Sequence, residues 1–143
     1  MKLMDVKLES AELNAFLAEV FPQVADDYRV ERVAPMEADV RLSISDRHLR
    51  PGGTVSGPSM FALADLAMYA VTLARIGREA LTVTTSCSID FMRKPAPDRD
   101  MIGRARILKL GRVLVVGDVL LFSEGIAAAV ARAGMTYSIP PRG

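Results

Sequence analysis

The chain has 143 residues, with 18 Lys and Arg, 17 Asp and Glu, one His and one Cys. Half of the residues are hydrophobic and the net charge is +1, which excludes an intrinsically disordered chain and argues against a nucleic-acid-binding module. One Cys and one His exclude an intramolecular disulfide, a multi-Cys zinc site and a His-rich metal site. Because residues 1–5 lack the apolar core of a signal peptide, we expect a single cytoplasmic domain spanning residues 1–143.

The stretch from Pro51 to Ala74 contains one charged residue, Asp65. Its apolar part starts only at Met60, so it is shorter than the ~20 residues that a bilayer span needs, and a carboxylate lies in its middle. We therefore expect a helix at about residues 57–77 that is buried inside the protein, with no membrane contact.

Residues 10–21 are expected to form an amphipathic helix, with Ser10 as its N-cap and Pro22 ending it. The apolar residues recur at helical spacing and form one stripe. They are Leu13, Phe16, Leu17, Val20 and Phe21.

Alternating apolar and polar residues predict two half-buried strands, at 37–45 and 83–91. Residues 29–35 are the expected hairpin partner of the first strand. In the second strand, Cys87 is expected on an apolar face as a buried, unreactive thiol, with Thr84 on the opposite, polar face. The expected apolar face comprises Val83, Thr85, Cys87, Ile89 and Phe91, and the polar face Thr84, Ser86, Ser88 and Asp90.

Three more strands are expected near the C-terminus. Residues 101–110 predict a strand with a bulge after Ile107, and the nearly all-apolar run 113–122 predicts a central strand covered on both faces. Residues 127–133 could be helical by propensity, but the β-type end of the segment 126–139 favours a strand. One long helix among six strands with short turns predicts an α+β domain, an antiparallel sheet wrapped around a central helix.

Asp65 is the strongest functional candidate. Its helical neighbours, three and four residues away, are Phe61, Ala62, Met68 and Tyr69. A carboxylate in such surroundings loses hydration and needs partners, and buried carboxylates concentrate at functional sites. The alternative is a structural Asp that accepts hydrogen bonds from loop backbone.

The start of the same helix is a second candidate. Gly57 suits the N-cap and Pro58 the first helical position, and the free N–H groups there can stabilise a developing oxyanion. An ordinary helix start is the alternative. Gly57 and Asp65 are eight residues apart, ~12 Å along a helix, so one helix cannot bring both to one reacting carbon. A site that uses both groups predicts a homodimer.

Residues 48–58 have the sequence HLRPGGTVSGP and are followed by Leu63 and Asp65. They resemble the central motif of the hotdog-fold thioesterases of the PaaI type, roughly H-x-N-P-x-G-T-x-H-G-G and then L-x-D on a helix. Residues 91–95 and 108–112 are similar to the F-L-R-P segment of that family and to the tight turn that follows it. The resemblance implies a hotdog dimer, or a dimer of dimers, that hydrolyses an acyl-CoA thioester.

Roles for individual residues also follow from this resemblance, which covers about residues 35–140. It implies that Asp65 acts as nucleophile or general base, that the Gly57 N–H of the other subunit polarises the carbonyl, and that Thr84 helps to place the water, with Ser56 beside them. It implies no metal or organic cofactor, coenzyme A being part of the substrate. The implied substrate-binding residues are Arg50 and Phe91 together with Arg93, Lys94, Lys109 and Arg112, basic residues that would meet the CoA phosphates.

The chain departs from the family pattern at three positions, where Arg50 replaces Asn, Ser56 replaces His and Pro58 replaces Gly. Arg50 can pair with a carboxylate or an acidic substrate group, Ser56 can donate a hydrogen bond, and Pro58 removes a backbone donor. These changes keep open a second hypothesis, a non-catalytic dimer that binds an acyl-CoA or another acyl ligand. A hydratase is a weaker candidate, because hydratases of this fold usually add a His beside the acid and only His48 is present.

Overall fold

The computed structural model describes residues 6–141. Six strands form one antiparallel sheet in the order β1-β2-β4-β5-β6-β3. The strands are β1 (Tyr28–Ala34), β2 (Glu37–Leu42), β3 (Val83–Phe91), β4 (Met101–Leu110), β5 (Leu114–Ser123) and β6 (Ala131–Ser138). The helices are α1 (Ser10–Val20), α2 (Pro22–Ala25) and α3 (Gly57–Ile76), with a 3-10 turn, η1, at Asp46–His48.

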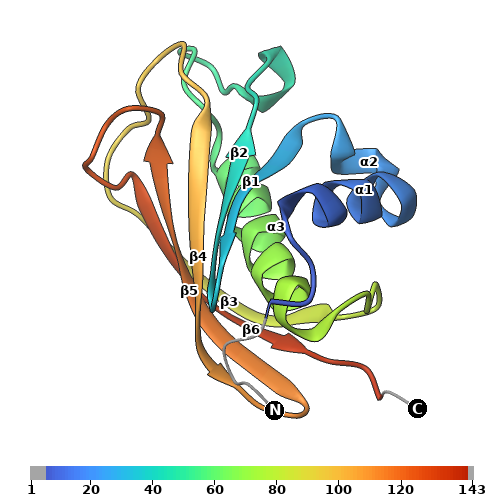
Figure 1. Cartoon of the computed structure of the whole chain (residues 1–143). Helices are drawn as coiled ribbons and strands as arrows, with labels where there is room; N and C mark the ends of the chain where they lie inside the picture. The colour runs from blue at the N-terminus through green and yellow to red at the C-terminus, as the bar shows by residue number, and fades with distance from the viewer. Residues whose placement is uncertain (1–5, 142–143) are drawn as a thin grey trace.

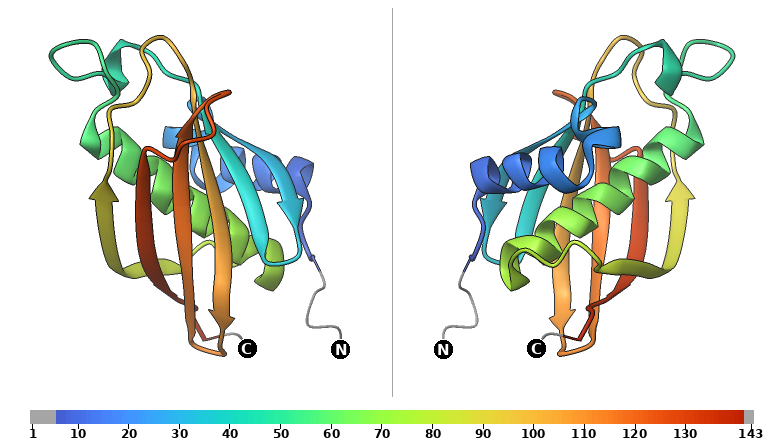
Figure 2. Two further views of the ribbon diagram at one scale, coloured as in Figure 1. Left: turned by 90° about the vertical axis from the view of Figure 1, so that its left-hand side faces the viewer. Right: turned by 90° about the vertical axis from the view of Figure 1, so that its right-hand side faces the viewer.

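The sheet curves around α3, and α1 and α2 lie on the same side of the sheet as α3 (Figure 1). Figure 2 shows α3 crossing the strands obliquely, with α1 beside it. An antiparallel sheet wrapped around one long helix is the hotdog fold, so the predicted fold class is confirmed.

The central helix packs very closely on the sheet. Leu63 and Met68 are fully buried. A Cβ at Gly103 of β4 would lie 3.2 Å from Leu63, and one at Gly117 of β5 would clash with the backbone carbonyl of Arg106 on β4 and lie 2.6 Å from the end of the Met68 side chain. Glycine at these two positions therefore allows the close approach. By length and hydropathy α3 could also cross a membrane, but 78% of its apolar window is buried in this protein.

Helix α1 begins at Ser10, as the predicted range does, but its N-cap is one residue earlier than predicted. Glu9, not Ser10, is its N-cap, because the Glu12 carboxylate accepts the Glu9 N–H at 3.1 Å and so satisfies a donor at the helix start. Pro22 ends α1 as predicted and also starts α2. The predicted apolar stripe is only partly buried, since Phe21 at its end stays 39% exposed.

The first hairpin and the C-terminal strand are confirmed with adjusted bounds: β1 starts one residue earlier than predicted, whereas β2 and β6 are shorter. β2 pairs with β1 and ends at Leu42 rather than Ser45. Residues 131–138 form β6, so the helical alternative for this region is wrong. The bulge predicted after Ile107 is present as a register shift in the pairing of β4 with β5.

The prediction that the central strand β5 is covered on both faces is wrong. Val119 and Leu121 are fully buried against the helix side, whereas Leu114 and Leu120 are 48% and 39% exposed. The reason is that α1 and α3 cover the same face of the sheet (Figure 2), which leaves the outer face of β5 open to solvent in one chain.

The predicted faces of β3 are also corrected. The register shifts between Thr84 and Ser86, so that Thr84 lies opposite Tyr137 and Cys87 lies opposite Met135. Paired residues in an antiparallel ladder share a face, so Thr84 and Cys87 both face the helix, and Thr84 is not on the polar face. A bulge inserts one extra residue and reverses the alternation. Cys87 is half-buried rather than buried, and desolvation raises the pKa of its thiol.

Candidate active site

Asp65 lies on α3 where β3 and β6 meet the helix. Its Oδ1 accepts hydrogen bonds from the Thr84 hydroxyl at 2.5 Å and from the Tyr137 hydroxyl at 2.6 Å. Within residues 6–141 its second oxygen, Oδ2, has no hydrogen-bond partner. The carboxylate is therefore oriented through one oxygen and can act through the other.

Tyr137 was not among the predicted site residues. Its hydroxyl also lies 2.7 Å from the backbone carbonyl of Asp65. Burial, reinforced by the negative charge of Asp65, raises the tyrosine pKa well above its ordinary value, so the phenol stays protonated and donates. Its alternation with Met135 and Ile139 in the last strand was the only signal, and this alternation is equally typical of a core residue.

The pairing of β3 with β6 explains why both hydroxyls reach the same oxygen. Thr84 lies directly opposite Tyr137, and the bulge at Thr85 turns Thr84 toward the helix. Nearby, Tyr69 of α3 has its ring centroid 6.3 Å from that of Tyr137, and its hydroxyl donates to the Ala80 carbonyl at 2.9 Å. Three elements thus fix the surroundings of the carboxylate.

A pocket of about 540 Å³ opens beside Asp65. Its walls come from the end of α1, from α2, from α3 and from the segment that leads into β3. The lining is mostly apolar: Val20, Phe21, Val24, Tyr28, Ala62, Leu66, Tyr69, Ala80, Leu81, Thr82 and Val83, with Asp65, Thr84 and Tyr137. Thr82 is buried, and its hydroxyl has no hydrogen-bond partner in the described part of the chain.

The start of α3 differs by one position from the prediction. Ser56, not Gly57, is the N-cap, because the Ser56 Oγ accepts the Ser59 N–H at 3.2 Å and contacts the Ser59 hydroxyl at 3.1 Å. Gly57 is the first helical residue and Pro58 the second. The Gly57 N–H has no acceptor within the helix, so it can serve an incoming oxygen. The Ser56 side chain is engaged in capping.

Phe91 lies beside this helix start. Its ring is 3.5 Å from the point where a Cβ on Gly57 would lie. The side chain is 51% exposed. Phe91 is the last residue of β3, so the Gly57 end of the helix and the end of β3 form one local group.

The six predicted substrate-binding residues do not come together in one chain. Arg50 lies in the loop before α3, where its backbone N–H donates to the Thr54 carbonyl at 2.8 Å. The Arg93 guanidinium donates to the Ala129 carbonyl, and Lys94 follows it at the same end of the sheet as Phe91. Lys109 and Arg112 lie at the hairpin between β4 and β5, at the opposite end of the sheet.

His48 has a structural environment. It is 5% exposed, its Nδ1 accepts the Ser45 N–H at 2.9 Å, and its Nε2 lies 3.3 Å from the Asp27 carboxylate. It thereby fixes the loop before α3. In the described residues, 6–141, no three His, Cys, Asp or Glu side chains are grouped as metal ligands.

Comparisons with known proteins agree with this architecture. A family model described as the thioesterase superfamily matches residues 52–130. A protein from Silicibacter sp. TM1040, described as a candidate thioesterase, is 58% identical, covers 98% of this chain and 97% of its own, and has a TM-score of 0.91. No curated protein matches the chain.

Two more distant structures are similar as well. A mutant of the phenylacetic acid degradation protein PaaI from Thermus thermophilus is 29% identical over 83% of this chain and 99% of its own, with a TM-score of 0.71. The protein smu.793 from Streptococcus mutans UA159 is 21% identical over 80% of this chain and 90% of its own, with a TM-score of 0.69. By its fold, by the family model and by the 58% identical relative, this chain belongs to the thioesterase superfamily.

Proposed function

We propose that this protein hydrolyses an acyl-CoA thioester to the free acid and coenzyme A. Family membership supports thioester hydrolysis in general. The observation that carries the proposal is the state of Asp65, whose Oδ1 is held by two hydroxyl donors while the carboxylate lies in the wall of an apolar pocket.

The chemistry starts at the unpaired oxygen of Asp65. As general base, Oδ2 takes a proton from a water molecule while the water oxygen attacks the thioester carbonyl carbon. As nucleophile, the same oxygen attacks the carbon directly and the resulting anhydride is hydrolysed. In both routes a tetrahedral oxyanion forms, the C–S bond breaks, and the CoA thiolate leaves and takes up a proton. Thr84 and Tyr137 keep the carboxylate in one orientation throughout.

The oxyanion needs a donor that Asp65 cannot supply, and we assign this role to the Gly57 N–H of a partner subunit. β3 is at the edge of the sheet, and an unpaired edge can add the same strand of a second copy. Antiparallel pairing would lay the Phe91 end of one β3 beside the Thr84 end of the other. Because Gly57 packs on Phe91, a homodimer of this kind brings the partner's Gly57 toward Asp65.

The same pairing would gather the basic residues. Arg93 and Lys94 of one subunit and the partner's Lys109 and Arg112 would lie toward the same end of the joined sheet, where they can meet the CoA phosphates, with Arg50 beside the helix start. The S. mutans protein smu.793, which shares this fold, was solved bound to acetyl CoA. That structure supports the choice of a CoA thioester over other thioesters.

A second candidate function is a dimer that binds acyl-CoA without hydrolysing it. The specific observation in its favour is the capping role of Ser56, which occupies the hydroxyl at the position where the family pattern has a His. The two candidates differ in whether CoA is released.

The test is thiol release from short, medium, long and aryl acyl-CoAs. We expect hydrolysis by the wild type, and a loss of about 10²- to 10⁴-fold in Asp65→Ala, the range for a general base. Asp90→Ala is the matched control, because Asp90 lies on the exposed side of the same edge strand and pairs with Arg132. Full activity in a folded Asp65→Ala protein would refute the role of Asp65. A wild type that binds acyl-CoA but hydrolyses none of the panel would support the binding dimer.

A further inference from the structure

We infer that the pocket beside Asp65 holds an uncharged acyl group of medium length, and that the α1–α2 segment sets the upper limit of that length. This inference rests on the proposed function, since it places the thioester carbonyl at Asp65. It names the substrate class and the residues that select it.

The size of the pocket excludes a very short acyl group as the best fit. Its volume is about 540 Å³, whereas a cavity of about 150 Å³ is enough to hold benzene. An acetyl group would leave most of this space to water. Each further methylene that enters an apolar pocket improves binding by about fourfold, so acyl chains of medium length, or ring-containing groups of equal bulk, gain more than short ones.

The charge of the lining selects for an uncharged acyl group. Asp65 is the one charged residue among the described residues that line the pocket. A second carboxylate on the acyl group, as in succinyl-CoA, would meet no cation among the lining residues of this chain and would lie beside a like charge, which is strongly unfavourable.

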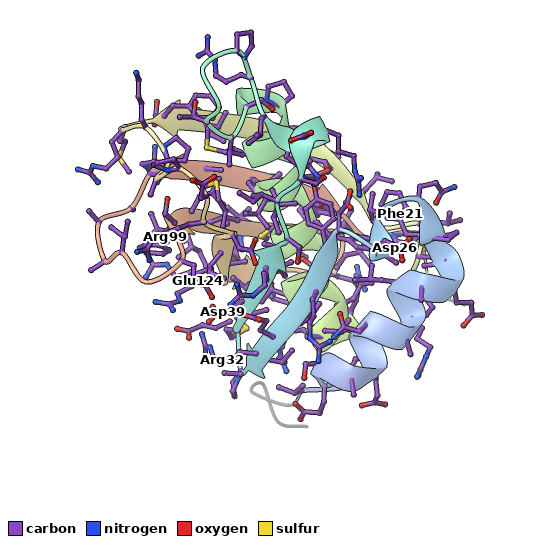
Figure 3. All side chains as sticks on the ribbon, turned by 90° about the horizontal axis from the view of Figure 1, so that it is seen from above. Phe21, Asp26, Arg32, Asp39, Arg99 and Glu124 are labelled. Atoms are coloured by element: carbon purple, nitrogen blue, oxygen red, sulfur yellow. The ribbon has the colours of Figure 1, made fainter. Side chains whose placement is uncertain are left out.

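The outer wall of the pocket comes from α1 and α2, outside the matched family region 52–130. Val20 and Phe21 end the apolar stripe of α1 and remain 37% and 39% exposed. Pro22 starts α2 directly afterwards, which brings Val24 into the same wall. Figure 3 shows Phe21 at this end of α1, on the opposite side of the molecule from Arg99 and Glu124.

The opposing inner wall is more constrained than the α1–α2 wall. Ala62 and Leu66 belong to the central helix, and Tyr69 is fixed there by its hydrogen bond to Ala80. A substitution on α3 would disturb the core, whereas α2 has no fully buried residue. The α1–α2 wall can change without disturbing the core, so we assign the upper limit on acyl length to Phe21 and Val24.

The test compares kcat/KM for butanoyl-, octanoyl-, dodecanoyl- and succinyl-CoA in four proteins: wild type, Val24→Trp, Phe21→Ala and Gln23→Trp. We expect the wild type to prefer octanoyl- or dodecanoyl-CoA over butanoyl-CoA and to disfavour succinyl-CoA. Val24→Trp should lower kcat/KM for dodecanoyl-CoA by about 15-fold, the effect of excluding two methylenes, with a smaller loss for butanoyl-CoA. Phe21→Ala should shift the optimum to longer chains.

Gln23→Trp is the control, because Gln23 is exposed on the same short helix and does not line the pocket. It should leave the chain-length profile unchanged. Thermal unfolding checks that Val24→Trp and Phe21→Ala are folded. If both are folded and both keep the wild-type chain-length profile, the inference is overturned. A wild-type preference for butanoyl- or succinyl-CoA would overturn it as well.

A binding measurement separates this inference from the proposed function. The wild type and Val24→Trp are titrated calorimetrically with CoA, butanoyl-CoA and dodecanoyl-CoA. If no thioester is hydrolysed but dodecanoyl-CoA binds more tightly than butanoyl-CoA, and Val24→Trp removes the difference, the hydrolase proposal fails and the pocket assignment holds. If thioesters are hydrolysed with no dependence on chain length, the pocket assignment fails and the hydrolase proposal holds.

Discussion

The proposed site uses two positions on α3, Asp65 and Gly57. They differ in how much of the proposed catalytic arrangement a single chain provides around them. At Asp65, side chains from β3 and β6 already donate to the carboxylate, and a pocket lies beside it. At Gly57, the helix start is capped and packed against Phe91, yet it is two turns from the carboxylate. A single chain therefore orients the Asp65 carboxylate by itself, whereas the Gly57 N–H can act only on a substrate bound at the Asp65 of a partner subunit.

Removing the Gly57 N–H tests the role of the helix start and should give the largest effect. In Gly57→Pro the first helical position keeps a compatible φ but loses its donor. We expect kcat to fall by about 10²- to 10³-fold, the usual effect of removing an oxyanion donor. Gly57→Ala keeps the N–H, and its Cβ would lie in ordinary contact with Phe91 at 3.5 Å, so it should stay close to wild type.

Mixing two inactive variants tests whether the site crosses subunits. Asp65→Ala and Gly57→Pro proteins are unfolded together, refolded and assayed for thiol release. In a mixed dimer one of the two sites combines an intact Asp65 with an intact Gly57, so about one quarter of wild-type activity should return. No recovery from a mixture that forms mixed dimers would show that both groups act within one subunit or that Gly57 has no role.

Tyr137→Phe sharpens the comparison at the carboxylate end. It removes one of the two donors to Oδ1, and a hydrogen bond to a charged group is worth about 1.5–3 kcal/mol, so kcat should fall by about 10- to 100-fold. Tyr69→Phe is the control, since its hydroxyl donates to Ala80 instead. Because burial raises the Tyr137 pKa above the ordinary 10.0, the wild-type pH–rate profile should show no loss from tyrosine ionisation below pH 10. Equal activity in the two Phe variants would contradict the role of Tyr137.

Ser56→Ala gives the smallest expected effect. Losing an N-cap side chain lowers the free energy of unfolding by about 1 kcal/mol, measurable by urea denaturation. Ser56→Asp, which can still accept the Ser59 N–H, should retain most of that stability. If Ser56 acts only as a cap, kcat changes little in either variant, whereas a large fall in kcat with unchanged stability would assign it a catalytic role.

The sequence predicted the elements better than it predicted the site. The central helix, its carboxylate and the succession of helices and strands along the chain follow from apolar periodicity and from turns, which are local signals. Tyr137 was missed because alternation with Met135 and Ile139 does not distinguish a core tyrosine from one that donates to a carboxylate 72 positions away. The same limit applies to Phe21, which belongs to a helix stripe in the sequence but lines a pocket in the structure.

The face of Thr84 could not be predicted for a different reason. Strict alternation assumes an unbroken ladder, and one added residue reverses the assignment on one side of the bulge. The outer face of β5 shows the converse. Its apolar composition indicates burial, yet Leu114 and Leu120 are exposed in this chain because both long helices lie on the other face of the sheet.

The bulge at Thr85 also limits how the protein can be rebuilt. It leaves Thr84 and Cys87, three positions apart in the sequence, on one face of β3, whereas residues on one face of an unbroken strand are an even number of positions apart. A β3 transplanted from a bulge-free relative would bring every side chain of the right kind and still turn the hydroxyl at position 84 toward solvent. In loop grafts and family chimaeras of this fold, residue count across β3 therefore matters as much as residue identity.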